Sequence, residues 1–113
     1  MMSGQPKTVK IMLDYLQGPI WLSDIETGAP NTGIDVVDTD PVVRELNGRC
    51  AELFNGYYEF DSHGQPCWFN YKKEKEDKGL LLGLIAELLS RLNEINDGSY
   101  VVEDCVTERI KNL

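Results

Sequence analysis

A run of leucine and isoleucine at helical spacing places the strongest constraint on the fold of this chain. The apolar positions recur at intervals of three and four residues: Leu81, Ile85, Leu88, Leu92 and Ile95. They therefore share one side of a helix, which Leu84 and Leu89 widen. Such a helix is stable in water only when that side is buried. We expect a helix that begins near Tyr71 with exposed, charged first turns and ends at Gly98, packed on a sheet.

A second amphipathic helix is predicted over 41–55. Asp40 can cap its free N–H groups, Pro41 suits the first helical position, and Thr39 is the alternative cap. Its apolar face consists of residues spaced by three or four: Val43, Leu46, Cys50, Leu53 and Tyr57. Gly48 within this helix suggests close packing against a neighbour, and Gly56 is suited to end it.

Short apolar or aromatic segments at 8–13, 20–22, 57–60, 67–70 and 100–102 are predicted to be strands. Turn-forming residues at 17–19 and 61–66 make two hairpins out of the first four, and 23–35 is expected to be a loop. Residues 106–113 form either a helical turn or a frayed tail. The pattern predicts an α+β fold, with a small, mostly antiparallel sheet and two main helices packed on one face. The 113 residues fit a single domain with an ordered core at about 8–105.

Negative charge is concentrated between Lys10 and Arg44, a stretch that contains no Lys or Arg. Its acids are Asp14, Asp24, Glu26, Asp35, Asp38 and Asp40. The whole chain has a formal net charge of -8. This balance argues against nucleic acid as the direct ligand, because phosphates are bound by Lys and Arg. It favours a positively charged partner, and a solubilising surface is the alternative reading.

Aromatic residues of the kind that anchor protein interfaces flank these acids. We predict a partner-binding set that combines both kinds of side chain: Asp14, Tyr15, Trp21, Asp24, Glu26, Asp35, Asp38 and Asp61. Trp21 lies in a predicted strand, so a place in the core is its alternative role. Asp38 and Asp40 could together bind a cation, but helix capping by Asp40 is the preferred interpretation.

The residues give little support to catalysis, a cofactor or a metal. His63 is the one histidine, and Cys67 follows it by four residues with no further ligands nearby, so we expect a solvated turn rather than a zinc site. Cys50 lies on an apolar helix face, which favours a buried, inert thiol. An enzyme that uses His63 with a nearby acid would lack orienting partners. We predict that the protein is not an enzyme and holds no cofactor or metal.

Cysteine use and hydropathy indicate the compartment. The three cysteines, Cys50, Cys67 and Cys105, are widely spaced and form no CxxC pair. No apolar run approaches the roughly 18 residues that a membrane span needs. We therefore expect a cytoplasmic protein with reduced thiols and no direct contact with a membrane.

The segment LDYLQGPIWLSDIETG at 13–28 resembles small bacterial immunity proteins of contact-dependent growth inhibition and related polymorphic toxin systems. The string D-Y-x-x-G-P-I-W, from Asp14 to Trp21, is its most specific part. The acids, the Pro-started helix, the aromatic run YYEF and the leucine-rich helix extend the resemblance over about 8–102. It implies a cytoplasmic protein, not an enzyme, that binds one cognate toxin domain, often a nuclease, and blocks it.

Two other roles stay open at the level of sequence. A regulatory or adaptor domain that binds another cytoplasmic protein would share most of these features. Genome context separates the two roles, since an immunity gene lies directly downstream of its toxin gene. Self-association is the other possibility, because Gly79 and Gly83 in GLLLG would permit close helix contacts, although ordinary core packing also accounts for that helix.

Overall fold

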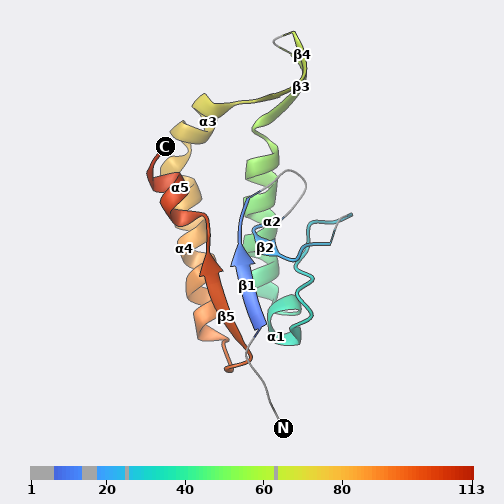
Figure 1. Cartoon of the computed structure of the whole chain (residues 1–113), viewed down its shortest axis with the longest axis vertical. Coiled ribbons are helices and arrows are strands. Elements are labelled where there is room, and N and C mark those ends of the chain that lie inside the picture. Colours follow the sequence, from blue (N-terminus) through green and yellow to red (C-terminus); the bar gives the residue numbers. More distant parts are fainter. Residues whose placement is uncertain (1–6, 14–17, 25, 63) are drawn as a thin grey trace.

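The molecule combines a three-stranded sheet, a separate two-stranded hairpin and two main helices, α2 and α4 (Figure 1). The computed structural model describes residues 7–13, 18–24, 26–62 and 64–113. The elements follow in this order: β1 (Lys7–Ile11), β2 (Ile20–Trp21), α1 (Asp35–Asp38), α2 (Pro41–Asn55), β3 (Tyr58–Ser62), β4 (Gln65–Phe69), α3 (Tyr71–Glu76), α4 (Lys78–Glu94), β5 (Tyr100–Asp104) and α5 (Thr107–Lys111). The predicted α+β class is confirmed.

The three-stranded sheet has β1 at its centre, in the order β2-β1-β5. β1 runs antiparallel to β2, with Lys10 opposite Trp21, and parallel to β5, with Ile11 opposite Asp104. The hairpin β3–β4 is antiparallel and forms its own sheet. The pairing is therefore mostly antiparallel, as predicted, but sequence reasoning did not anticipate the parallel pairing of β1 with β5.

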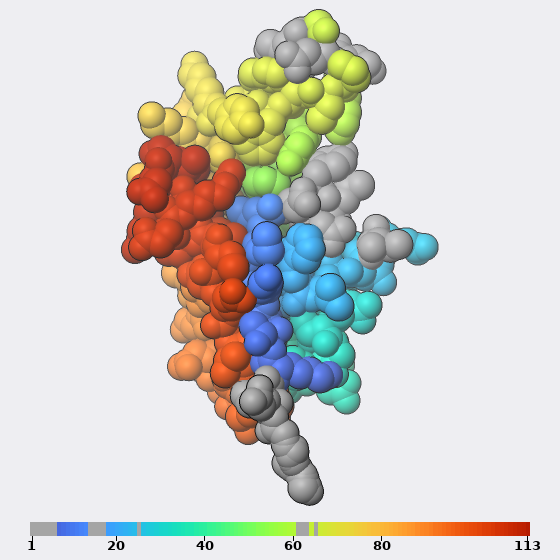
Figure 2. Space-filling view, viewed as in Figure 1, coloured from blue at the N-terminus to red at the C-terminus, as the bar shows by residue number. Residues whose placement is uncertain are grey.

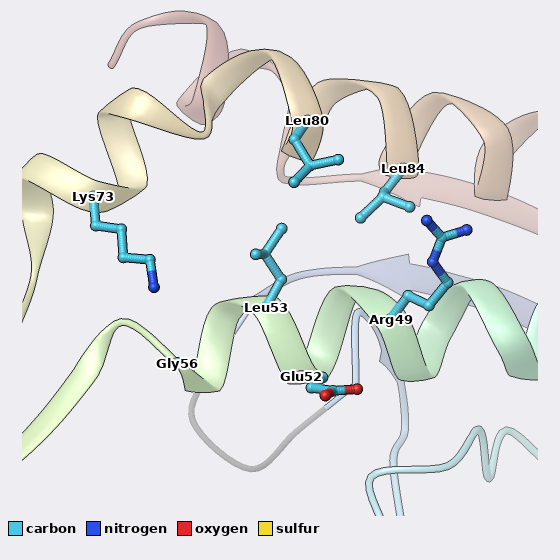
Figure 3. A pocket seen from close by; sticks show the side chains of 7 residues that line it. All are labelled: Arg49, Glu52, Leu53, Gly56, Lys73, Leu80 and Leu84. Atoms are coloured by element: carbon cyan, nitrogen blue, oxygen red, sulfur yellow. The ribbon is translucent and has the colours of Figure 1, made fainter.

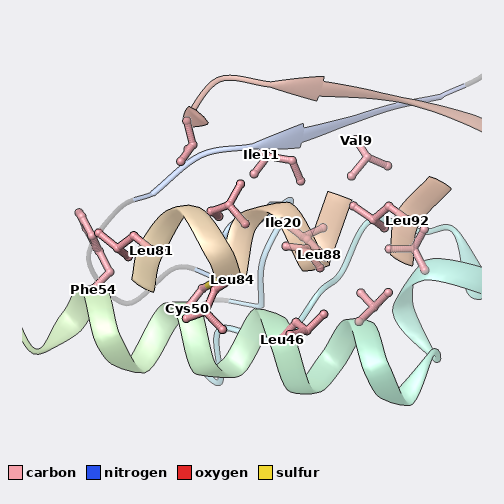
Figure 4. Close-up of a cluster of buried hydrophobic side chains, with 14 of the residues drawn as sticks. Val9, Ile11, Ile20, Leu46, Cys50, Phe54, Leu81, Leu84, Leu88 and Leu92 are labelled. Atoms are coloured by element: carbon pink, nitrogen blue, oxygen red, sulfur yellow. The ribbon is translucent and has the colours of Figure 1, made fainter. Parts of the chain in front are cut away.

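The core lies between the inner face of the three-stranded sheet and the pair of helices α2 and α4 (Figure 4). Alternation along β1 turns Val9 and Ile11 inward, and both are fully buried. The predicted leucine seam of α4 is buried against them, with Leu88 and Leu92 at 0% exposure. α2 contributes its predicted apolar face, including the buried Cys50. Apolar burial on this scale is the main force that stabilises the fold.

Asp40 joins the beginning of α2 to the end of α4. Its Oδ2 accepts from the Val43 backbone N–H at 2.9 Å, so Asp40 and not Thr39 caps α2. The Arg91 guanidinium donates to both carboxylate oxygens, at 2.6 and 3.0 Å. These hydrogen bonds from Arg91 lower the pKa of Asp40 below its ordinary value. One carboxylate thus provides a helix cap and an interhelical ion pair.

The prediction of one continuous helix from Tyr71 is wrong. The helix is interrupted at Asp77, which separates α3 from α4. Asp77 accepts a hydrogen bond from the Tyr57 hydroxyl at 2.8 Å, and this contact holds the junction against the end of α2. The expected exposure of the first turns also fails at Glu74, which is fully buried and accepts from Arg109 of α5 at 2.8 Å.

The expectation of close packing at Gly48 is also wrong, because a Cβ there would meet no atom within 4 Å. The segment 23–35 is a loop until α1 begins at Asp35. Residues 107–111 form the helix α5, so of the two predictions for residues 106–113, the helical turn is confirmed. No helix in the described ranges is long and apolar enough to cross a membrane.

Two substitutions separate the roles of Asp40. Asp40→Ala removes the cap and the ion pair, and we expect it to lower the free energy of unfolding by about 1–2 kcal/mol in urea titrations at neutral pH. Asp40→Asn retains a capping oxygen but loses the charge, so its loss should be smaller. Equal losses in the two variants would contradict the capping role.

Wild type and Asp40→Asn should also differ in how their stability depends on pH. Because folding lowers the pKa of Asp40, its charge stabilises the fold above the unfolded pKa of about 4 and ceases to do so as pH falls through the folded pKa. The stability difference between wild type and Asp40→Asn should therefore shrink below about pH 4. A difference that stays constant down to the acid transition would show that the Arg91 pair contributes nothing.

Candidate protein-binding surfaces

A buried polar cluster shapes the segment that carries most of the predicted binding residues. The Asn47 side chain of α2 accepts from the Ile20 N–H at 3.1 Å and donates to the Gly28 carbonyl at 2.8 Å. Ser23 Oγ accepts from the Gly18 N–H at 3.1 Å and lies 3.0 Å from the Ile20 carbonyl, to which it can donate. These contacts satisfy backbone groups that would otherwise be buried without partners.

The packing in this cluster explains its glycines. A Cβ on Gly18 would lie 2.4 Å from the Gly28 carbonyl oxygen and equally close to Asn47. Gly28 has a φ of 73°, a conformation that side-chain-bearing residues rarely adopt. The path of the chain around β2 is therefore set by steric as well as polar contacts, and it holds the following loop against α2.

The segment that begins with Trp21 of β2 and runs to Glu26 has apolar and acidic residues close together in sequence. Leu22 is 65% exposed, and Trp21 is partly buried, with its indole Nε1 enclosed and without a hydrogen-bond partner in the described part of the chain. Asp24 Oδ1 accepts from the N–H groups of Glu26 and Thr27 at 2.8 and 3.0 Å, and these bonds lower the pKa of Asp24. The Glu26 side chain is exposed.

The remaining residues of the predicted partner-binding set lie in different settings. The Asp38 carboxylate accepts from the Thr32 N–H and hydroxyl and from the Gly33 N–H at 2.7–3.0 Å, which fixes the turn before α1. Asp35 is exposed on α1. Asp14 and Tyr15 lie outside the described residues, as does the side chain of Asp61 in β3.

We call the side chains of five residues in this segment the β2–α1 surface: the partly exposed Trp21 and Asp24 and the exposed Leu22, Glu26 and Asp35. Figure 2 shows the chain that carries it, in light blue and teal, along one side of β1. In the same view, the outer face of the three-stranded sheet is visible, and β1 and β5 lie at the surface. Sequence reasoning identified this acidic segment but missed Leu22, although its place between Trp21 and Asp24 was the available signal.

A second surface lies on α2 and α4, where a hollow of about 360 Å³ opens (Figure 3). Its lining residues are Arg49, Glu52, Leu53, Gly56, Lys73, Leu80 and Leu84. Figure 3 shows Arg49 and Lys73 at opposite ends with the leucines between them. The sequence did not reveal this hollow, because its leucines come from two helices and Leu80 stands off the buried seam.

Burial alters two of the reactive side chains that the structure describes. Burial raises the pKa of the Cys50 thiol to about 12, which keeps it protonated and unreactive at neutral pH. Burial also raises the pKa of Tyr57, and its hydrogen bond to Asp77 acts in the same direction. Within the described ranges, no group of three or more His, Cys, Asp or Glu side chains could hold a metal ion. His63 lies outside those ranges.

Comparison with known proteins adds no family to these observations. No protein-family model matches the chain, and neither the curated proteins nor the solved structures contain a significant match.

The hydrogen bonds of Asn47 predict how its substitution changes the stability of the protein and the protection of the loop backbone. Asn47→Ala leaves the Ile20 N–H and the Gly28 carbonyl without partners, so we expect a loss of about 2–4 kcal/mol in the free energy of unfolding. The exposed Asn93 of α4 provides a control, since Asn93→Ala should change stability by less than about 0.5 kcal/mol. Amide exchange should quicken at Gly28 in the Asn47 variant, and unchanged exchange there would contradict the anchoring role.

Proposed function

We propose that the protein is a cytoplasmic immunity protein that binds a cognate toxin domain and neutralises it. The observation that carries this proposal is the β2–α1 surface, where exposed Leu22 and partly exposed Trp21 adjoin the carboxylates of Asp24 and Glu26. No Lys or Arg lies in the sequence between Lys10 and Arg44. The flanking cations, Lys7 and Arg44, reach the backbone of this segment at Gly33 and Asp38. The immunity-protein resemblance falls on the same stretch of chain.

The proposed partner is a basic domain, and a nuclease fits best. A nuclease must expose Lys and Arg to bind phosphate, and these side chains attract a surface rich in carboxylates. Opposite charge accelerates the encounter, whereas buried apolar contacts slow dissociation. A bound acidic surface would occupy the cations that the nucleic acid requires, which is sufficient to block the enzyme without any reaction.

The fold is suited to a binding role of this kind. Asn47 bonds the backbone at Ile20 and Gly28, on either side of the loop, and Ser23 bonds that of Gly18, so both ends of the loop are fixed before binding. The carboxylate of Asp24 is fixed by two backbone N–H groups, whereas the Glu26 side chain is exposed to a partner. A preorganised surface of this type loses less entropy when it binds.

The first test is protection in cells. The C-terminal domain encoded by the gene immediately upstream would be expressed with and without this chain. Toxicity that disappears on co-expression, together with a purified complex of the two proteins, would support the immunity role. Toxicity that this chain does not relieve, or an upstream product without toxicity, would reject the role and favour a regulatory or adaptor protein.

A matched pair of variants tests the acidic surface. Glu26→Lys with Asp35→Lys reverses two exposed carboxylates of the β2–α1 surface, and we expect the association rate to fall at least about tenfold at low salt. Glu76→Lys with Glu108→Lys makes the same change in net charge on α3 and α5. That control should alter the rate by less than about threefold. Similar losses in both variants would mean that net charge, and not this surface, determines recognition.

A further inference from the structure

The helix α3 holds a carboxylate in the interior of the protein. The Glu74 side chain is 0% exposed, and its Oε2 accepts from Arg109 Nη2 of α5 at 2.8 Å. The other oxygen, Oε1, is enclosed and has no hydrogen-bond partner in the described part of the chain. A carboxylate is costly to remove from water unless its oxygens are paired. The folded state therefore bears a cost at Glu74 that Arg109 offsets only in part.

The groups near Glu74 add negative charge to its surroundings. The Tyr57 hydroxyl donates to Asp77 Oδ2 at 2.8 Å. Burial and this hydrogen bond raise the pKa of Tyr57, and the negative charges of Asp77 and Glu74 act in the same direction, so both carboxylates lie close to that hydroxyl. Within the described ranges, Arg109 is the one cation at ion-pair distance from Glu74. The compensation of this buried charge thus comes from α5.

α5 is weakly attached for an element with this role. It has five residues and packs on α4, next to α3 (Figure 1). A helix of this length is not stable in water by itself. Its attachment consists of the fully buried Ile110, the half-exposed Arg109 and a 3.5 Å hydrogen bond from Lys78 to the Leu113 carbonyl. A short segment with so few buried groups can open while the rest of a protein stays folded.

The beginning of α5 is fixed to the end of β5. Asp104 Oδ1 accepts from the N–H groups of Val106 and Thr107, at 3.0 Å each, and Val106 is buried. Arg109 and Ile110 lie beyond this fixed point. A movement of α5 about it would separate Arg109 from Glu74 and admit water to the carboxylate. The solvation that Glu74 regains favours this open form, whereas burial of Ile110 favours the closed form.

We propose that α5 is a latch with two positions. In the closed position Arg109 bonds Glu74, and in the open position the Glu74 carboxylate is in water while the sheet, α2 and α4 stay folded. Loss of Arg109 leaves an uncompensated buried charge and opens the latch, whereas loss of the Glu74 charge removes the reason to open. The two partners therefore act in opposite directions, unlike those of an ordinary surface ion pair. This inference does not depend on the proposed immunity function.

Amide hydrogen exchange of the full chain, followed residue by residue by NMR, tests whether α5 opens alone. In wild type, the Ile110 and Asn112 amides, both hydrogen-bonded within the last turns, should have protection factors at least about thirtyfold below that of Leu88 in α4. Equal protection at all three amides would show that α5 opens only when the whole protein unfolds, and the proposal would fail.

Three variants separate a latch from ordinary packing of α5. Arg109→Met should lower the protection of Ile110 and Asn112 at least about tenfold, with Leu88 unchanged. Glu74→Met should leave their protection equal to wild type or higher. Lys111→Met removes the same charge as Arg109→Met from an exposed position of the same helix, so it should change protection by less than about threefold.

The double variant shows whether Arg109 acts through the carboxylate. In the Glu74→Met background, Arg109→Met should change protection by less than about threefold, because no buried charge is left to compensate. A tenfold loss that persists there would mean that Arg109 acts by packing. Lower protection in Glu74→Met, or a loss in Lys111→Met as large as that in Arg109→Met, would also overturn the proposal. If Arg109→Met alone unfolds, Glu74→Met and the double variant carry the test.

Discussion

The apolar contact between one face of the three-stranded sheet and the helices α2 and α4 is the constraint on which the rest of the structure depends. β1 supplies the centre of that contact, since Val9 and Ile11 are fully buried and the strand is paired along both edges. Both helices therefore lie on the same side of the sheet, and the opposite face remains open (Figure 1). Every candidate binding surface is a region that this contact leaves uncovered.

Polar side chains at the edge of the core determine the backbone path in those uncovered regions. Asn47 and Ser23 determine where the chain runs after β2, and Asp38 closes the turn that leads into α1. Asp40 is used entirely within the fold, by α2 and Arg91. A cluster of acids in the sequence thus divides into structural carboxylates and a smaller number, such as Glu26, that remain exposed to a partner.

Sequence reasoning succeeded where the signal was local. Asp40-Pro41 and Gly56 bracket α2 correctly, because the signals depend on immediate neighbours. The turn residues at 61–66 correctly predict the hairpin β3–β4, although its strands extend further into that stretch, to Ser62 and from Gln65. The interruption at Asp77 depends on Tyr57, and the inward turn of Asp38 depends on Thr32 and Gly33, contacts that composition does not encode. The hollow needed coordinates as well, since two helices must first be brought together.

The parallel pairing of β1 with β5 has a consequence for the nascent chain. Ile11 is opposite Asp104, so the strand at the centre of the sheet lacks one neighbour until synthesis has passed residue 104. Contacts so distant in sequence form slowly, and a partly made chain leaves the apolar faces of α2 and α4 incompletely covered. Prematurely terminated products that lack β5 cannot complete the core, which makes them natural substrates for chaperones and proteases.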